Sequence, residues 1–477
     1  MSVISEINRR LGRGTWPPPE QREVWDRVEL FAAFRDSDRT RIGQEASVSW
    51  SQPYMLSPIP RMISRASANM LFGEPPEISA AADGDKANLE RIETENMLDA
   101  ELHRGAVIAS SEGEVWGRVV VSPDVLDVPI IEFASRSRVI PHFAGRFVRG
   151  ATFVTTWATS QTERVRLLES YEPGKVSCTL YRGTRTSLGQ EIGLDSFEAT
   201  KGRAAEVFTG IDWPLAAFIP NTIDADPTRG YRDYAGLEDR FLALNEASTI
   251  GQGNMRLAGR KRALIDAGYV QSDADGRAQL PTGDDVFVRT SRAGGDDEKT
   301  APLQVIDYGF QAGEVVAWVD HLIDSTLTFA GISPQQVGRA VDGQALSGTA
   351  MKLKMAHSLL EASGKGRFFD RGVARLLRGA QILDGRPISE GGFGRTYAKR
   401  DEAPTIRRAP AMPRDDLEAA QVLASLTAAD AISLEERVAF ARPDLSEKQR
   451  AEEVARIKAE QDIPFGSTDD PQSPLAA

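Results

Sequence analysis

The chain has few of the residues from which disulfides and metal centres are built. Its 477 residues contain one cysteine, Cys178, and four histidines. A single cysteine excludes an intrachain disulfide and a cysteine metal cluster. The histidines, at positions 103, 142, 321 and 357, form no H-x-x-x-H or H-E-x-x-H pair. We therefore expect no zinc site.

Long apolar runs are also missing. The most apolar stretch, Val315 to Phe329, is too short for a membrane span and contains Asp320, His321 and Asp324. The first residues, MSVISEINRRLGRGTWPPPE, lack the apolar core of a signal peptide. We expect no membrane span and no membrane partner.

The chain has no excess of positive charge. Its 57 Lys and Arg residues and 69 Asp and Glu residues give a formal net charge of −12. Affinity for nucleic acid comes mainly from neutralised phosphates, so an acidic monomer is expected to bind DNA poorly. Any contact with DNA would use local basic patches or would have to be weak. The length is sufficient for two to four folded domains.

A glycine-rich segment, DGQALSGTAMKLKMAHSLLEASGKGRFF at 342–369, raises the question of a phosphate-binding loop. Such a loop requires G-x-x-x-x-G-K-[ST] after a buried strand. Gly343 and Gly348 have the right spacing, but Thr349 stands where the lysine is needed. Lys365 is followed by a glycine and has no strand before it. No nucleotide site is predicted here.

The same segment favours a flexible loop followed by a helix. Ser347 is placed to cap the first amides of that helix. Gly343 and Gly348 would give the loop its freedom, and Gly364 and Gly366 are expected to interrupt and bend the helix.

No other motif indicates an active site. The pair Asp284–Asp285 in TGDDVFV is similar to paired metal-binding carboxylates, but aspartate is a common turn former and a turn is favoured. There is no G-x-S-x-G motif, and GGFGR at 391–395 lacks the strand and helix of a dinucleotide fold. We expect no catalytic residue, no metal and no cofactor, and hence no enzyme.

Basic residues form two groups at helical spacing. The first group stands at the end of a long helical pattern and consists of Arg256, Arg260, Lys261 and Arg262. The second forms a stripe along a later helix and consists of Arg367, Arg371, Arg375 and Arg378. Each group is either a solvated face partly paired with acids or a surface for DNA phosphate or an acidic neighbouring subunit. If the second interpretation holds, Arg371→Glu with Arg375→Glu impairs assembly or packaging more than Lys86→Glu.

The periodicity along the chain predicts an α+β protein. Helices are expected at 59–71 and 88–103, followed by successive short strands up to about residue 225, which favours a mostly antiparallel sheet. From residue 231 the order is a long helix, a small β-containing segment with VFVRT as its clearest strand, and a second helix. Capping boxes at Ser433–Glu436 and Ser446–Gln449 begin helices near the end.

Six segments, in order over nearly the whole chain, resemble the portal proteins of long-tailed bacteriophages. They are ANMLFGEPPEIS, ASSEGEVWGRVVV, WPLAAFIPN, YAGLEDRFLALNEAST, ALSGTAMKLKMAHSLLEASGKGRFFDRGVARLL, and ADAISLEERVAF with EEVARIKAEQ. The fifth is similar to the most recognisable stretch of that family, in which Ser-Gly-x-Ala-x-Lys leads into a long helix. Each segment alone is a weak signal, and it is their order that is specific.

The resemblance implies a portal-type subunit divided into the parts known from that family. These would be an N-terminal helical segment at 1–40, an α/β wing at 41–230, stem helices at 231–262 and 311–330, a clip at 263–310, a channel loop at 331–346, a long kinked helix returning to the wing at 347–411, a helical crown at 412–461 and a disordered tail at 462–477. In the channel loop, Arg339 and Asp342 are the only charged residues, and which of them faces DNA stays open.

The resemblance also implies partners and a place. The family forms a ring, usually of twelve subunits, at one capsid vertex of the virion, after assembly in the host cytoplasm. Double-stranded DNA passes through its channel without sequence specificity during packaging and ejection. The terminase large subunit, the major capsid or scaffolding protein and head-completion or adaptor proteins would dock on it. Two alternatives remain: a nucleotide- or metal-dependent DNA-processing enzyme using Lys365 or Asp284 and Asp285, and another minor structural protein of a phage.

Overall fold

The computed structural model describes residues 15–45, 54–258, 262–266, 271–272, 278–279, 286–289, 303–306, 312–339, 348–408, 416–442, 445 and 447–461. The chain divides into two units. The larger comprises Met1–Gly343 and Lys354–Ala411, and the smaller comprises Gln344–Leu353 and Met412–Ala477. The larger unit combines helices with mainly antiparallel sheets, in agreement with the predicted α+β class.

The larger unit begins with a series of helices. They are α2 (Pro19–Asp36), α3 (Arg39–Glu45), α4 (Ile59–Phe72), α5 (Lys86–Glu95) and α6 (Leu98–Glu112). Helix α4 confirms the helix predicted from residue 59. The single helix predicted at 88–103 is wrong, because the chain breaks between α5 and α6 at Met97, whose backbone is left-handed. The buried amide of Asn96 donates to the carbonyls of Ile92 and Pro129, which fixes the break.

Two antiparallel sheets follow. The first has the order β10-β2-β3 and consists of β2 (Glu114–Val120), β3 (Ile130–Ser135) and β10 (Ala216–Pro220). The second has the order β4-β5-β6-β7-β8, with β9 also pairing β7, and consists of β4 (Val139–Ala144), β5 (Phe147–Ala158), β6 (Glu163–Glu172), β7 (Lys175–Thr184), β8 (Gln190–Ile192) and β9 (Glu206–Phe208). Hairpins joined by Gly145 and Gly174, both with positive φ, connect consecutive strands, which confirms the antiparallel pairing predicted for this region.

The long helix α9 (Gly348–Asp384) packs on the first sheet at very short range. A Cβ at Gly372 would overlap the side chain of Ile219, and one at Gly379 would lie 2.6 Å from that of Leu215. Both partners belong to β10 or the residues just before it. Glycines on α9 therefore let helix and sheet approach closely over the main core, where Trp116 is fully buried.

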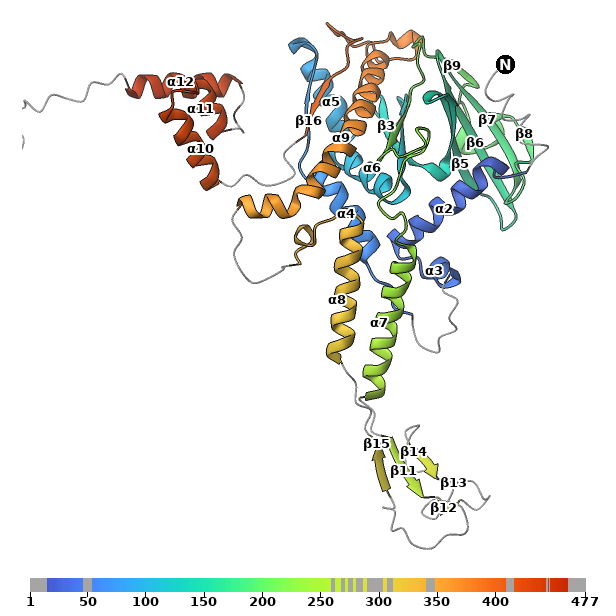
Figure 1. Ribbon diagram of the computed structural model, residues 1–477. Coiled ribbons are helices and arrows are strands. Elements are labelled where there is room, and N and C mark those ends of the chain that lie inside the picture. The colour runs from blue at the N-terminus through green and yellow to red at the C-terminus, as the bar shows by residue number, and fades with distance from the viewer. Residues whose placement is uncertain are drawn as a thin grey trace, which may run out of the picture. The chain divides into compact units, whose positions relative to one another are not determined.

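Two helices, α7 (Glu238–Ala258) and α8 (Ala312–Phe329), lie side by side (Figure 1). Phe241 and Leu244 of α7 share a core with Leu322 and Leu327 of α8. At about 1.5 Å per residue the 21 residues of α7 span roughly 31 Å. Between them in the chain come β11 (Arg262–Asp266), β12 (Gln271–Ser272), β13 (Ala278–Gln279), β14 (Val286–Arg289) and β15 (Leu303–Ile306).

This segment confirms the predicted order of helix, strands and helix, and VFVR forms β14 as predicted. It departs from the antiparallel pattern, since β11 pairs β14 in parallel and β15 antiparallel. A further pairing joins β1 (Glu77–Ser79) to β16 (Thr405–Arg407), more than 300 residues apart in the chain, which the sequence did not predict.

The smaller unit contains α10 (Asp416–Ala428), α11 (Leu434–Ala441) and α12 (Glu447–Gln461). The predicted capping box of Ser433 and Glu436 is confirmed at the start of α11. Ser446 of the second predicted box and the tail at 462–477 lie outside the described residues. In the part of the chain that the structure describes, no helix is long and apolar enough to cross a membrane.

Candidate functional site

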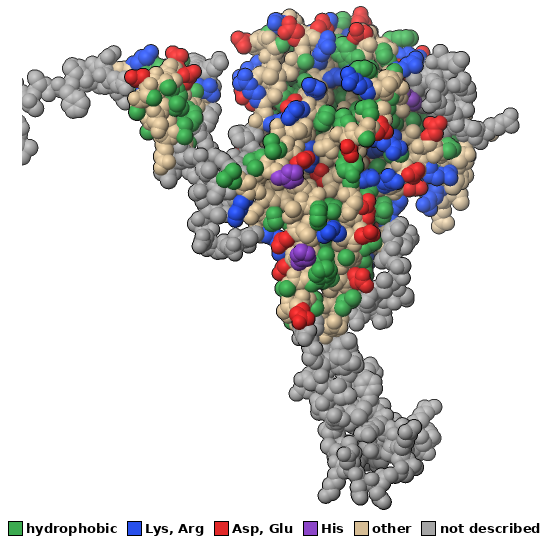
Figure 2. Space-filling model, in the orientation of Figure 1, with side chains coloured by type: hydrophobic (Ala, Val, Ile, Leu, Met, Phe, Trp, Pro, Cys, Tyr) green, Lys and Arg blue, Asp and Glu red, His purple; other side chains and the backbone are tan. Residues whose placement is uncertain are grey.

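Helix α8 carries large apolar side chains that are exposed to solvent, in addition to those that pack against α7. Val316, Trp318 and Phe329 are 59%, 54% and 66% exposed. In the lower part of Figure 2, hydrophobic side chains lie among acidic ones over α7 and α8. Trp318 and Phe329 are eleven residues apart, about three helical turns, and therefore lie on one side of the helix, whereas Val316 lies on the opposite flank. We call Trp318 and Phe329 the outer α8 face. Exposed aromatic side chains on one side of a helix are candidates for a surface of association.

Polar neighbours hold two of these aromatic side chains in place. The ring of Trp318 stacks on His321, with 5.8 Å between centroids. The guanidinium of Arg240 on α7 lies 4.5 Å from the centroid of Phe329 and donates to Ser325 Oγ at 2.9 Å. The aromatic groups are therefore ordered in the single chain, so little side-chain entropy would be lost on association.

Arg339 does not extend freely from the predicted channel loop. Its Nη2 lies 2.8 Å from Asp320 Oδ1 and its Nε lies 2.7 Å from Asp324 Oδ1, both on α8. The hydrogen bond to Asp320, with support from Asp324, raises the pKa of Arg339. The loop folds here into the 3-10 turn Pro334–Val337. An i, i+4 pair of acids on α8 was visible in the sequence, but nothing indicated that Arg339 would reach it.

The predicted basic stripe on α9 divides into an exposed half and a covered half. Arg367 and Arg371 are exposed, whereas Arg375 and Arg378 are partly buried. The guanidinium of Arg378 lies 4.1 Å from the centroid of the Trp213 ring. Burial, together with the charge of Arg378, lowers the pKa of Arg375. Within this stripe, only the first two arginines present an exposed positive surface to a partner.

Helix α9 runs without a break through both of its central glycines, so the predicted interruption is wrong. A Cβ at Gly366 would overlap the guanidinium of Arg408, which pairs with Asp370 at 2.9 Å. A Cβ at Gly364 would meet nothing within 4 Å. Gly366 therefore makes room for an arginine from a distant segment, a role that the sequence did not predict.

Lys365, the cation considered for a nucleotide site, is only 4% exposed. Its Nζ donates to both carboxylate oxygens of Asp233, at 2.7 and 2.9 Å, and to Ser67 Oγ at 2.9 Å. Asp233 also accepts from Asn221 Nδ2 and Ser110 Oγ, both at 2.7 Å. The buried pair joins the middle of α9 to the residues that lead into α7, and leaves the lysine no free donor for a phosphate.

For several predicted site residues the structure describes no side-chain position. Arg256 is in α7, Arg262 begins β11 and Gly348 begins α9, but no side-chain position is described for the two arginines. The others lie outside the described residues: Arg260, Lys261, Asp342, Gly343, Ser347, Asp284 and Asp285. For these positions the channel and hinge roles stay predictions.

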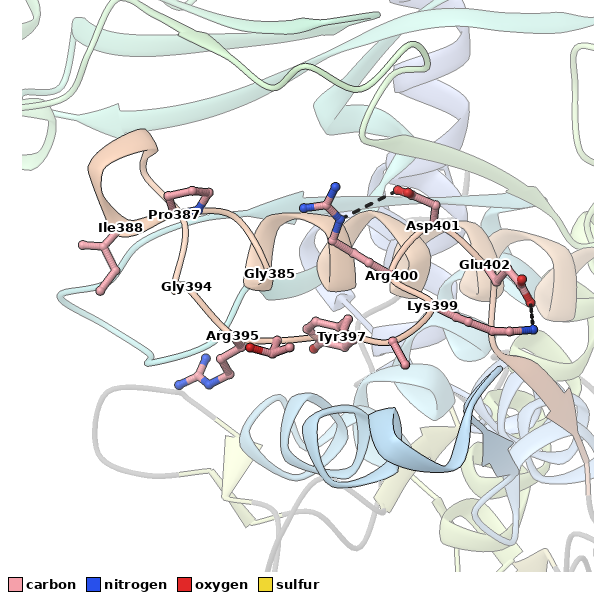
Figure 3. A pocket seen from close by; sticks show the side chains of 12 residues that line it. Gly385, Pro387, Ile388, Gly394, Arg395, Tyr397, Lys399, Arg400, Asp401 and Glu402 are labelled. Atoms are coloured by element: carbon pink, nitrogen blue, oxygen red, sulfur yellow. Dashed lines mark hydrogen bonds and ion pairs between the residues drawn. The ribbon is translucent and has the colours of Figure 1, made fainter.

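A cavity of about 860 Å³ lies along the segment from Gly385 to Glu402 (Figure 3). Its cations are already paired: Arg395 with Asp384 and Asp127, and Lys399 with Glu402 at 3.1 Å. The Tyr397 hydroxyl donates to Asp384 at 2.8 Å. The remaining cation of the lining, Arg400, lies 3.9 Å from Asp401, so each Lys and Arg that lines the cavity faces a carboxylate. Among the residues that the structure describes, no group of His, Cys, Asp or Glu could hold a metal ion.

The similarity of this chain to known proteins is distant. No protein-family model and no curated protein matches the chain. Among the solved structures that align with this chain, two are aligned over 92% of this chain and 97% of theirs. One is the neck of a native GTA particle computed with C12 symmetry, at 13% identity and a TM-score of 0.46. The other is the neck of an empty GTA particle computed with C6 symmetry, at 14% identity and a TM-score of 0.45. Similarity at this level assigns neither a fold nor a role to this chain.

Proposed function

We propose that this chain is the subunit of a viral portal, a ring at one capsid vertex through which double-stranded DNA is packaged and ejected. The observation that carries the proposal is the outer α8 face, where two ordered aromatic side chains stay exposed on a helix that already packs against α7 along a neighbouring side. The ordered sequence resemblance and the order of helix, strands and helix support the same interpretation. In this proposal α7 and α8 form the stem and 263–310 the clip.

A ring forms when one surface of a copy contacts a different surface of the next copy. The outer α8 face, with Trp318 and Phe329, differs from the outer surface of α7, where Ile250 is partly exposed beside Glu246. A contact between two unlike surfaces repeats from copy to copy and closes into a ring when the rotation permits. Each copy contributes a net charge of −12 to the ring, and in this proposal the channel lining is not strongly basic. Such a lining lets DNA slide because it does not hold the phosphates tightly.

The proposed role is structural. Terminase, capsid or scaffolding protein and head-completion proteins would dock on the ring, and the terminase would supply the ATPase. Within the predicted stripe on α9, the exposed Arg367 and Arg371 would meet an acidic neighbour. No observation favours the nucleotide-dependent alternative, because Lys365 is buried and engaged by Asp233.

The test is a pair of matched variants of the full chain. Trp318→Asp places a charge in the outer α8 face, whereas Phe147→Asp places one at the β4–β5 hairpin, where Phe147 is 66% exposed. Burying an unpaired charge at every contact of a ring is strongly unfavourable. We expect Trp318→Asp to remain monomeric by mass photometry while Phe147→Asp and the native chain assemble. Equal assembly of both variants would contradict the use of this face.

A further inference from the structure

The short segment that follows α8, residues 330–339, is held by a different kind of contact at each end. Its start is held by α9, where the hydroxyl of Ser358 donates to the carbonyl of Gly331 at 2.7 Å and accepts from the amide of Ser333 at 2.9 Å. Ser358 is only 3% exposed. The end of the segment returns to α8, where Arg339 pairs with two carboxylates. The start is therefore fixed by buried, uncharged groups and the end by charged ones.

The charged contact is open to solvent. The side chains of Arg339, Asp320 and Asp324 are 30%, 51% and 45% exposed. Ion pairs with this exposure are weak and are screened by salt, because the Debye length falls to about 3 Å at molar ionic strength. The two aspartates stand one turn apart on α8, so the arginine also relieves the repulsion between them. The contact is therefore strong at low ionic strength and weak when charges are screened.

We propose that Arg339 is a salt-sensitive latch, which closes the end of this segment onto α8 at low ionic strength and releases it when the ion pairs are screened. The rest of the segment stays in place in both states, because Ser358 is buried and Val337 packs against the core that α7 and α8 share. From Arg339 the chain continues to α9, which begins at Gly348, so the latch sets the point from which this connection starts.

Hydrogen exchange of single amides, measured on the full chain by mass spectrometry with electron-transfer fragmentation, tests the latch. The amides of Gly338 and Arg339 each donate to a carbonyl of the same segment at 3.1 Å and report on its end. The amide of Ser333 reports on its start. In Arg339→Gln at low salt we expect the two end amides to exchange about fivefold faster than in the native chain, and the Ser333 amide to be unchanged.

Salt separates the latch from a general loss of stability. In the native chain, about 1 M NaCl should bring the exchange of the two end amides close to that of Arg339→Gln, whereas the variant itself should not respond to salt. The matched control is Arg41→Gln, which removes the ion pair between Arg41 and Glu29 at 2.7 Å and should leave all three amides as in the native chain.

Two results would overturn the proposal. One is a pair of end amides that respond neither to Arg339→Gln nor to salt. The other is faster exchange of the Ser333 amide in Arg339→Gln, because the whole segment would then open as one unit. The inference goes beyond the proposed ring, since each contact that it uses lies within one chain. A chain that never assembles but responds as predicted would contradict the portal proposal and support the latch.

Discussion

Removing the buried cation Lys365 is expected to be among the most destabilising single changes in the larger unit. In Lys365→Met the side chain keeps its length and loses its charge, so Asp233 remains as a buried anion. Breaking a buried ion pair from one side typically costs about 3–5 kcal/mol. Asp233 would keep the hydrogen bonds from Asn221 and Ser110, so we expect the lower end of that range, about 3 kcal/mol. In Asp233→Asn the buried Lys365 keeps its charge and loses its carboxylate partner, so we expect the free energy of unfolding to fall by about 4 kcal/mol.

Urea unfolding followed by tryptophan fluorescence measures this loss, because all seven tryptophans belong to the larger unit. The control is Lys86→Met, which removes an exposed pair with Glu90 at 3.8 Å and is expected to cost less than about 1 kcal/mol. The double variant of Lys365 and Asp233 should lose less than the sum of the two single losses. A Lys365→Met protein as stable as Lys86→Met would refute the reasoning.

Three further predictions concern packing, pH and the basic surface. Gly372→Ala forces a methyl group against the side chain of Ile219 and should lower the free energy of unfolding by about 1–3 kcal/mol. Gly364→Ala places its methyl group in open space and should raise the free energy of unfolding by up to about 1 kcal/mol. Urea unfolding measures both changes. Burial and a neighbouring carboxylate raise the pKa of Glu93 to about 7 from an ordinary value of 4.5. The folded state therefore loses stability as pH rises from 4.5 through 7, and Glu93→Gln should raise the Tm by a few degrees at pH 8 and leave it unchanged at pH 4. Arg371→Glu should reduce assembly or packaging more than Lys86→Glu, and equal behaviour in a packaging assay would contradict a role for the exposed arginines.

Local patterns in the sequence were enough to predict much of the fold. Apolar spacing predicted the helix at 59 and the two helices that enclose the strand segment, since these signals depend on residues three or four apart. Valine-rich runs separated by glycine turns predicted the antiparallel strands. The capping box at Ser433 was readable because both of its members lie within one turn.

The features that the sequence did not indicate depend on contacts between distant segments. Gly366 looked like a helix breaker, and only the position of Arg408 shows that it provides space. Lys365 was weighed as a phosphate ligand and not predicted to be one, but the sequence did not indicate its partner Asp233, which lies 132 residues earlier. Arg339 is held by acids of the preceding helix. Such pairings follow from the tertiary fold and leave no local periodic signal.

The central claim is a ring with an open axial channel, and electron microscopy of the purified full-length chain tests it most directly. We predict rotationally symmetric rings whose channel is wide enough for duplex DNA, with α7 and α8 of adjacent copies in contact through Trp318. A protein that stays a small monodisperse monomer under all assembly conditions, or a closed particle without a channel, would contradict the account.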